Sequence, residues 1–474
     1  MPLGVYIASL EGAVAYWDTG EAQVVPWIFG IAHPTGFPVF VIAAGIFAHI
    51  FPIGAVSWRI ALFSAIAMSL TALMVFSILR ELAPKAETWI AAAAAWIFAF
   101  GEIVWTRGTR AEVHALAVCL SAVTLYFAVR WYARAEQRSL VWGALCWGMA
   151  IATHPIAAML APALCVIFFA RIRRLKRATF VLALLALISG VAFYAYLPLR
   201  SAAITNARLD PTRAIGEPPG RAFWDLDHPS TMSGLRHYLS GADYGAGGVF
   251  ASMIRVETYA AGGPRFFEAL WHEFAPLGLL FLFGGLVMFF RRDAIAGIAL
   301  FLAAAVPLSF ALGYTIEADP GRYYLIPFFV VAIFIGYGAL RIAAELPAMR
   351  LTTLFVMFGL AIGLIVLNRN IFAQPHDLGA KPLIATVIAK TSDGAILLAP
   401  WIDSTALAYA AYVQHSLGHR IVESAWLSDE AARVPGWVNA GRNVYVVDQI
   451  FGSVNGYKLI KIPGSPDLYR VVKE

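Results

Sequence analysis

The sequence predicts a mainly α-helical polytopic membrane protein with a small α/β domain at its C-terminus. Three observations lead to this fold class: an apolar composition, a series of long apolar runs, and a change to a soluble type of composition after about residue 370. Of the 474 residues, 60% are hydrophobic and 14% are charged, whereas a soluble globular protein has about 25% charged residues. Mean hydropathy is +0.72. An ordinary soluble protein is therefore excluded.

The charge balance gives no sign of a nucleic-acid partner. The chain has 35 Lys and Arg and 29 Asp and Glu residues, a formal net charge of +6. In a membrane protein this excess reflects basic cytoplasmic loops, and no basic patch is interleaved with aromatic residues. The start of the chain lacks a basic region with a small-residue cleavage site, so we expect no cleavable signal peptide. The three cysteines lie in apolar runs without CxxC spacing, which predicts core residues: Cys119, Cys146 and Cys165.

Apolar runs predict about 10 to 11 membrane spans. Residues 3–16 fall short of the roughly 20 residues that a span needs, so either the true start lies upstream or this helix is abbreviated. Residues 37–51, bounded by Pro38 and Pro52, are also short and predict an interfacial or re-entrant helix. The remaining spans are expected at 59–79, 87–105, 111–130, 140–153, 155–170, 178–198, 274–290, 294–313, 323–340 and 351–368.

Basic loops predict how the chain is oriented in its membrane. The strongest basic cluster, residues 171–177, should face the cytoplasm. Counting spans from this cluster puts the other basic clusters on the same side, provided that the helix at 38–51 does not cross. We therefore expect a multi-pass protein of a bacterial-type inner (plasma) membrane, with its active site and its C-terminal domain extracytoplasmic.

Two domains follow from this pattern. Residues 1–369 are expected to form the transmembrane domain, with a first outer loop at 17–58 and a long outer segment at 199–273. The long segment is too polar and too rich in Gly and Pro to be embedded, and short amphipathic helices are expected around 231–240 and 264–273. Residues 370–474 predict an extracytoplasmic α/β domain. Its helices are expected at 377–390 and 404–417 and its strands at 395–400, 443–448, 457–462 and 468–472.

Asp18 and Glu21 are the most informative polar residues, because they lie three residues apart in a chain where charge is scarce. A helix or a tight Thr-Gly turn would keep the two carboxylates close together. A partly desolvated carboxylate at a membrane boundary can act as a general base toward a hydroxyl group. The alternative is a capping or solvated surface pair, since Asp-x-x-Glu alone is a weak signal.

Four arginines are expected on the outer face, against the positive-inside trend: Arg107, Arg110, Arg200 and Arg322. The planar guanidinium group binds phosphate oxygens bidentately. For any one of these arginines, interfacial snorkelling or a structural ion pair is the more common explanation. As a set on one face, they favour an anionic ligand.

Three histidines on the expected outer face could bind substrate, transfer protons or coordinate a metal: His33, His114 and His154. Neither HxxxH nor HExxH spacing relates these three histidines, so their spacing gives no support for a zinc site. His33 and His154 each precede a proline, where a histidine commonly hydrogen-bonds at a broken helix. Phosphate-binding glycine motifs and Gly-x-Ser-x-Gly are absent from the sequence. The sequence assigns no cofactor with certainty, and a divalent metal stays an open alternative that the spacing does not support.

Five motifs occur in order along the chain: Trp17-Asp-Thr-Gly-Glu-Ala22, Gly30-Ile-Ala-His-Pro-Thr-Gly-Phe-Pro38, Arg110-Ala-Glu-Val-His-Ala115, Tyr196-Leu-Pro-Leu-Arg-Ser201 and Arg322-Tyr-Tyr-Leu-Ile-Pro327. Together they resemble a family of polytopic membrane proteins long labelled as a domain of unknown function. Its eukaryotic branch includes a transmembrane protein O-mannosyltransferase, and the family resembles the GT-C glycosyltransferases. The resemblance covers about residues 5–340. The chain departs from the pattern in its short first span and in Thr35, where the family commonly has proline.

The resemblance implies a function and a site. GT-C enzymes transfer a sugar from a polyprenyl-phosphate carrier on the extracytoplasmic side, with an acidic residue of the first outer loop as base. By motif position, Asp18 would be the catalytic base and Glu21 a second carboxylate that positions acceptor or donor. The residues expected to bind substrate are His33, Arg107, Arg110, Glu112, His114, His154, Arg200, Asp319, Arg322 and Tyr323.

The expected activity is that of a hexosyltransferase, with mannose as one candidate sugar. Its partners would be a lipid-linked sugar donor, an acceptor hydroxyl on protein, lipid or glycan, and the membrane. One alternative is a transporter or flippase of a lipid-linked glycan, and another is a non-catalytic envelope assembly protein. Transporters commonly have repeated halves and charges at the bilayer midplane, whereas here the polar residues cluster at one face.

Overall fold

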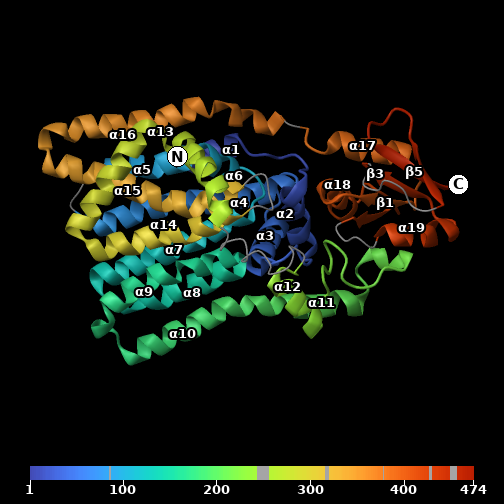
Figure 1. Ribbon diagram of the computed structural model, residues 1–474, viewed down its shortest axis with the longest axis horizontal. Helices are drawn as coiled ribbons and strands as arrows, with labels where there is room; N and C mark the ends of the chain where they lie inside the picture. The colour runs from blue at the N-terminus through green and yellow to red at the C-terminus, as the bar shows by residue number, and fades with distance from the viewer. Residues whose placement is uncertain (85–86, 243–255, 315–319, 377, 426–429, 449–455) are drawn as a thin grey trace. The chain divides into compact units, whose positions relative to one another are not determined.

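A computed structural model describes residues 1–474 apart from 85–86, 243–255, 315–319, 377, 426–429 and 449–455. The chain is mainly helical, as predicted (Figure 1). It divides into two compact units, each assembled from three stretches of sequence. The first unit comprises Met1–Leu10, Ala61–Tyr194 and Gly241–Gln374, and the second comprises Glu11–Ile60, Ala195–Ser240 and Pro375–Glu474.

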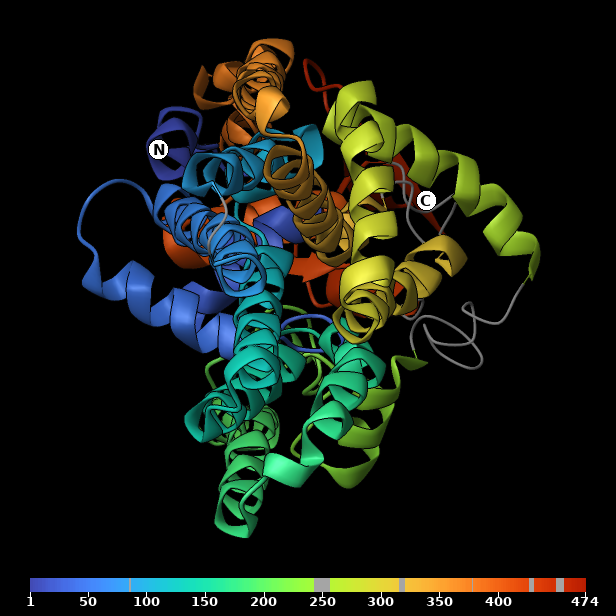
Figure 2. The same ribbon diagram turned by 90° about the vertical axis from the view of Figure 1, so that its left-hand side faces the viewer.

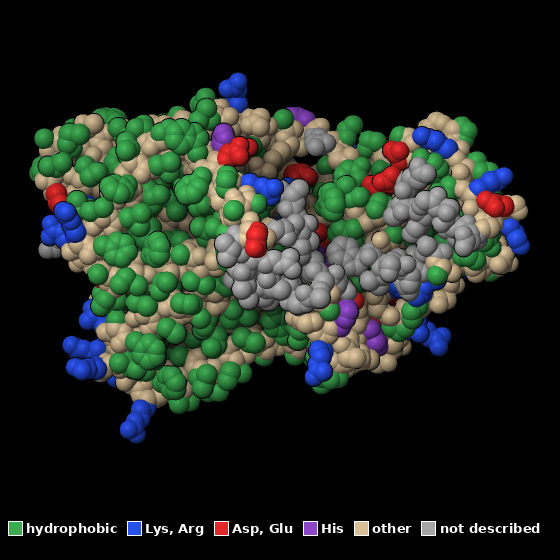
Figure 3. All heavy atoms as spheres, viewed as in Figure 1, with side chains coloured by type: hydrophobic (Ala, Val, Ile, Leu, Met, Phe, Trp, Pro, Cys, Tyr) green, Lys and Arg blue, Asp and Glu red, His purple; other side chains and the backbone are tan. Residues whose placement is uncertain are grey.

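The first unit is a bundle of apolar helices, several of which are seen nearly end-on in Figure 2. Hydrophobic side chains cover much of the face of this unit that Figure 3 shows, as expected for helices that face lipid. Its elements are α1 (Pro2–Ala8), most of α4 (Val56–Leu82), α5 (Thr88–Phe100), α6 (Glu102–Gly108), α7 (Val113–Arg134), α8 (Gln137–Thr153), η1 (Pro155–Leu160), α9 (Ala161–Ala170), η2 (Ile172–Arg174), α10 (Arg177–Val191), η3 (Ala192–Ala195), α13 (Val256–Arg292), α14 (Ala294–Gly313), η7 (Pro320–Tyr324), α15 (Leu325–Glu345), η8 (Pro347–Met349), α16 (Arg350–Leu367) and most of η9 (Arg369–His376).

The number of spans differs from the 10 to 11 expected. Among the described residues, seven helices are long and apolar enough to cross a membrane, or eight if α5 and α6, bent by 72°, form one broken span. The run at 3–16 forms only the seven-residue α1. The runs at 140–153 and 155–170 form α8 and the short pair of η1 and α9. Helix α8 ends at Thr153 because His154 precedes Pro155 and adopts an extended backbone.

Helix α15 lies at the centre of the first unit. Nearly all of its side chains are buried, and the helix packs against α5, α13 and α14. Its close approach to α13 depends on glycine, because a Cβ added at Gly285 would overlap the carbonyl oxygen of Phe334. Helix α13 is interrupted at Ala275 (φ 53°, ψ 167°), directly before Pro276. The helix expected at 264–273 is therefore the N-terminal part of this long element, not a separate short helix.

The second unit holds the C-terminal sheet predicted from the sequence. Its order is β2-β1-β3-β5-β4, with β1 parallel to β2 and β3, and β5 antiparallel to β3 and β4. All four predicted strands are present, whereas β2 and the helix α19 were not predicted. The elements of this part are α17 (Lys381–Lys390), β1 (Ile396–Ala399), α18 (Trp401–Ala408), the π-helix η10 (Tyr409–Val413), β2 (Ile421–Ser424), α19 (Glu430–Asn439), β3 (Val444–Val447), β4 (Tyr457–Lys461) and β5 (Leu468–Lys473).

The remaining elements of the second unit come from the first outer loop and the long outer segment. They are α2 (Trp17–Ile28), α3 (Pro38–Ile50), α11 (Tyr196–Ala207), η4 (Pro211–Ile215) and α12 (Met232–Ser240). Helix α12 confirms the short helix expected at 231–240. Helix α2 packs closely on α18 at Gly20. A Cβ added there would lie 2.7 Å from Thr405 Oγ1 of α18, and also 2.5 Å from the carbonyl oxygen of Ala15. This packing positions the acidic pair.

Candidate functional site

Asp18 lies in the first turn of α2, so the acidic pair is carried by a helix rather than by a turn. Its Oδ1 accepts a hydrogen bond from Trp401 Nε1 at 3.1 Å. The positive end of the helix dipole stabilises a carboxylate in the first turn. Asp18 is half-buried, so it combines a fixed position with partial access to solvent. A general base needs both properties.

Glu21 is buried, with 2% of its surface exposed. Its Oε1 accepts a hydrogen bond from the backbone N–H of His33 at 2.7 Å, and its Oε2 forms a short contact with His33 Nδ1. The His33 ring also lies edge-on to Phe37 and Trp401, with centroid distances of 4.9 and 6.1 Å. Glu21 therefore holds the His33 loop in place with both of its oxygens.

The loop after α2 is a tight, non-helical passage, as predicted from its prolines and glycines. The N–H of Gly36 donates to the carbonyl of His33 at 2.8 Å, so the turn forms with threonine at position 35. Gly36 has φ +85°, and a Cβ there would lie 2.6 Å from the hydroxyl of Tyr238. That hydroxyl donates to the carbonyl of Ala32. Only glycine fits this position without displacing Tyr238.

Arg200 binds the C-terminal end of α2. Its Nε donates to the carbonyl of Phe29 at 2.5 Å and its Nη2 donates to the carbonyl of Ile28 at 3.0 Å. Tyr196, one turn earlier on α11, donates to the Phe29 carbonyl at 2.6 Å. Positively charged donors satisfy the free carbonyls at a helix C-terminus. In this position Arg200 supports the acidic helix.

Asp18, Glu21 and His33 could also hold a metal ion. One ligand atom from each residue lies within 4.8 Å of the others. Two carboxylates and an imidazole suit several divalent cations. Sequence spacing gave no signal for this set, because His33 comes from the loop after α2 and not from the same helix face.

A second polar cluster lies in the first unit, around Glu112. This residue caps the N-terminus of α7, and its Oε1 accepts from the backbone N–H and from Nδ1 of His114 at 3.2 and 2.8 Å. Its Oε2 lies 3.1 Å from Arg107 Nη1 and 3.8 Å from Arg110 Nη2. Ser64 Oγ accepts from the backbone N–H of Glu112 at 3.1 Å. Glu112 is therefore the centre of a buried ionic network.

The charges around Glu112 keep it ionised. Burial raises the pKa of this carboxyl group, but the hydrogen bond from His114 and the positive charges of His114, Arg322 and Arg110 together outweigh burial and lower the pKa to about 2. Two arginines lie within 4.0 Å of this carboxylate, and guanidinium groups bind phosphate oxygens, so the cluster suits an anionic ligand.

Three aromatic rings complete the second cluster. The His114 ring lies 4.5 Å from that of His154 and 5.2 Å from that of Tyr323, measured between centroids. His154 comes from the break between α8 and η1, and Tyr323 comes from η7. Around Glu112 the structure thus gathers these predicted site residues: Arg107, Arg110, His114, His154, Arg322 and Tyr323. Asp319, also predicted, lies outside the described residues.

Two further residues of these clusters were not predicted from the sequence. Ser64 lies within an apolar helix, where a lone hydroxyl group is common and carries little signal. Trp401 lies in the C-terminal part of the chain, 383 residues from its partner Asp18. A local sequence pattern cannot reveal a pairing over that distance.

In fold, the protein is a GT-C-like membrane protein. The structure of ArnT from Cupriavidus metallidurans bound to undecaprenyl phosphate matches it with a TM-score of 0.61 and 12% identity, covering 99% of this chain and 96% of that chain. The archaeal oligosaccharyltransferase AglB from Archaeoglobus fulgidus, in complex with an inhibitory peptide and a dolichol-phosphate, matches with a TM-score of 0.52 and 12% identity, covering 94% and 69%. At these identities the likeness concerns the fold alone.

Sequence relatives give a narrower resemblance. The model of the Protein O-mannosyl-transferase TMEM260 N-terminal domain matches residues 18–178. The mouse (Mus musculus) Protein O-mannosyl-transferase TMEM260 is 27% identical over 255 residues, covering 51% of this chain and 33% of that protein. The Dictyostelium discoideum protein of the same name is 29% identical over 132 residues, covering 27% and 16%. The resemblance predicted from the motifs is confirmed, and the chain spans a third or less of these relatives' length.

Proposed function

We propose that this protein is a glycosyltransferase that moves a hexose, with mannose as the first candidate, from a polyprenyl-phosphate-linked donor to an acceptor hydroxyl group. The observation that carries the proposal is the anchored acidic helix: Asp18 in the first turn of α2, with Glu21 fixed against His33. The GT-C-like fold and the names of the sequence relatives support the same reaction class. The acceptor is a protein, lipid or glycan.

Asp18 acts as the general base in this proposal. Its carboxylate takes the proton of the acceptor hydroxyl, and the hydroxyl oxygen forms a bond to the anomeric carbon of the donor sugar. The bond between that carbon and the phosphate oxygen breaks, and the phosphate keeps the electron pair. In-line displacement inverts the anomeric centre. Glu21 acts by holding the His33 loop, which makes it a positioning residue.

The Glu112 cluster binds the donor phosphate in this proposal. Arg107 is buried and paired with Glu112, whereas the side chain of Arg110 is 22% exposed and lies farther from that carboxylate. Arg110, supported by Arg322, is therefore the arginine assigned to the phosphate oxygens. Stabilising the leaving phosphate as charge develops lowers the barrier to transfer.

The orientation proposed from the basic loops completes this account. In this proposal, residues 1–369 form a transmembrane domain and residues 370–474 form a second domain. Asp18 and the second domain face the extracytoplasmic side of a bacterial-type plasma membrane. Labelling of single introduced cysteines with a membrane-impermeant reagent in intact cells tests this orientation. A cysteine that replaces the exposed Asp393 should be labelled, and one that replaces the exposed Arg173 should be protected. The opposite result would contradict the proposed orientation.

Transfer is tested with membranes that contain the wild-type chain or the Asp18→Asn variant. The membranes receive a labelled polyprenyl-phosphate sugar, and covalent incorporation into endogenous acceptors is measured at equal protein abundance. Incorporation is expected for the wild type and is lost in the variant, while Asp393→Asn, which changes an exposed carboxylate, retains it. Near-normal incorporation by Asp18→Asn contradicts the assignment. Label that crosses the membrane without incorporation supports a transporter instead.

A further inference from the structure

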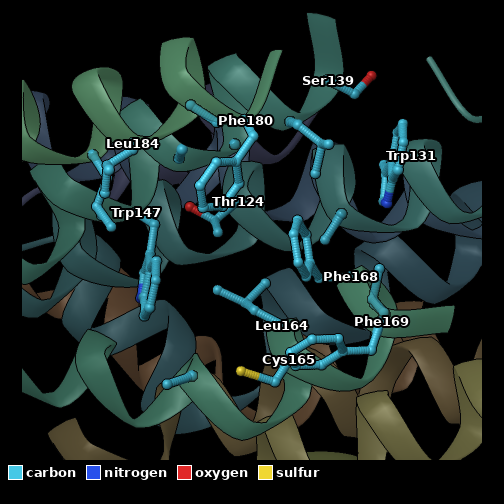
Figure 4. Close-up of a pocket in the computed structure, with 18 residues that line it drawn as sticks. Thr124, Trp131, Ser139, Trp147, Leu164, Cys165, Phe168, Phe169, Phe180 and Leu184 are labelled. Carbon is cyan, nitrogen blue, oxygen red and sulfur yellow. The ribbon is translucent and has the colours of Figure 1, made fainter. Parts of the chain in front are cut away.

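A cavity of about 320 Å³ lies among α7, α8, α9 and α10 of the first unit, and its lining includes no residue of the Glu112 cluster. Figure 4 shows side chains from these helices around it, and its exposed lining is apolar. Small-molecule sites commonly have volumes of about 300–1,000 Å³. The bulky side chains of the lining are Trp131, Trp147, Phe168, Phe169, Phe180 and Leu184, of which Phe169, Phe180 and Leu184 are exposed. The cavity is therefore open to an apolar chain.

The basic cluster at residues 171–177 lies next to this cavity in the sequence and in the fold. It connects Phe169 at the end of α9 with Phe180 in the first turns of α10, and both phenylalanines line the cavity. Arg171 is used structurally, since its Nε donates to the carbonyl of Tyr132 at 2.9 Å. Arg173 and Arg174 are exposed, and neither has a carboxylate within 4.0 Å among the described residues. Their charge is available to an anion.

The wall of the cavity exposes no polar atom. Its hydroxyl groups are used within the protein, since Thr124 donates to the carbonyl of Leu120 at 2.8 Å and Ser139 donates to Glu136 at 3.4 Å. A ligand in the cavity therefore places an apolar chain there. Its polar group must lie outside the cavity, where the basic cluster is.

We propose that this cavity and the adjacent basic cluster bind an anionic glycerophospholipid. An acyl chain fills the apolar cavity, and the phosphate lies against Arg173 and Arg174. Basic pockets between membrane helices bind anionic phospholipid headgroups in this way. This site is distinct from the donor site proposed above.

Native mass spectrometry of the purified full chain tests the proposal with three probes. Palmitoyl-oleoyl phosphatidylglycerol is compared with phosphatidylcholine of the same acyl chains and with undecaprenyl phosphate. The wild type is expected to retain phosphatidylglycerol in preference to phosphatidylcholine. In Arg173→Gln/Arg174→Gln, retention of phosphatidylglycerol is expected to fall about 10- to 30-fold, because each basic residue near a headgroup contributes about 5-fold.

Matched variants distinguish binding in the cavity from non-specific binding of lipid to the protein surface. Arg291→Gln/Arg292→Gln removes an adjacent arginine pair at the end of α13 and should leave retention unchanged. Ala183→Phe fills the cavity and should weaken phosphatidylglycerol binding. Equal retention of phosphatidylcholine, or retention that survives both the arginine and the Ala183 changes, overturns the proposal. So does undecaprenyl phosphate that binds more tightly than phosphatidylglycerol and is lost in the same variants.

Discussion

In the described part of the chain, the buried carboxylate of Glu21 accepts from the backbone N–H of His33 and contacts its ring Nδ1. Breaking a buried charged pair by removing one partner costs about 3–5 kcal/mol. We therefore expect Glu21→Ala to destabilise the protein by about that amount, and Glu21→Gln, which keeps an acceptor oxygen, to cost less. Thermal unfolding of the purified chain in detergent measures both. A Glu21→Ala protein as stable as the wild type would show that the pair contributes little.

Glu112 makes stability depend on pH. Its folded-state pKa of about 2 lies below the ordinary value of 4.5, so the folded state binds this proton less readily than the unfolded state. The stabilisation, on the order of 3 kcal/mol, is present above about pH 4.5 and is lost as pH falls toward 2. Unfolding measured from pH 7 to pH 3 should show this loss, and Glu112→Gln should flatten the dependence. A Glu112→Gln protein with the wild-type pH dependence would assign the loss to other groups.

Among single residues, the contacts that follow from the sequence are those between near neighbours in the chain. Arg107, Arg110, Glu112 and His114 fall within eight positions, so their mutual contacts follow from a short motif beside a helix start. The sequence predicted Arg200 as a phosphate ligand because the residue was expected on the outer face of the membrane. Its contacts with the carbonyls of Ile28 and Phe29 depend on the approach of α11 to α2, which the sequence does not encode locally.

At the scale of elements, the packing of α2 on α18 determines where Asp18 lies. A Cβ at position 20 would press on Ala15 and Thr405, and overpacking of a close contact costs about 1–3 kcal/mol. We expect Gly20→Ala to lower the midpoint of thermal unfolding and to reduce transfer activity as α2 shifts. Gly363→Ala is the matched control, because a Cβ there meets nothing within 4 Å. Equal effects of the two substitutions would contradict the role of this packing.

Glu273 holds the break between α5 and α6. Its carboxylate is fully buried and accepts from the backbone N–H groups of Ile103 and Val104 at 2.9 and 3.1 Å. These are free donors at the start of α6, the helix that carries Arg107. We expect Glu273→Ala to destabilise the protein by about 1–3 kcal/mol, with a smaller loss for Glu273→Gln. Hydrogen exchange at Ile103 and Val104 should accelerate in the alanine variant, and unchanged exchange would contradict the capping role.

Strand β2 shows why one element of the C-terminal sheet was missed. Ile421–Ser424 has four residues and contains Glu423, so its pattern does not indicate a buried strand. In the structure Glu423 is 1% exposed, and its Oε1 lies 3.7 Å from Nε of Arg221. A partner from the long outer segment thus allows a charge inside the sheet. The four predicted strands have the alternating or apolar patterns that a single strand reveals by itself.

At the scale of the whole molecule, composition and apolar run length predicted the class of protein. They also predicted more spans than the seven or eight helices of the described residues that are long and apolar enough to cross. Run length does not show how a run is divided: residues 137–153 form α8, whereas 155–170 form the pair η1 and α9. The second unit shows a further limit. Its three segments are joined by contacts such as Ala380 N–H to Val14 O at 2.8 Å and Trp437 Nε1 to Ile215 O at 3.0 Å. Pairings between such distant segments leave no local pattern.

Transfer by the purified protein tests the central claim most directly. The wild-type chain and Asp18→Asn are reconstituted in separate proteoliposomes with a labelled polyprenyl-phosphate hexose and an acceptor that carries hydroxyl groups. The initial rate of covalent incorporation should be lower for Asp18→Asn by about 100- to 10,000-fold, the range of general-base catalysis, while both proteins unfold at the same temperature. Incorporation by Asp18→Asn at the wild-type rate would contradict the claim.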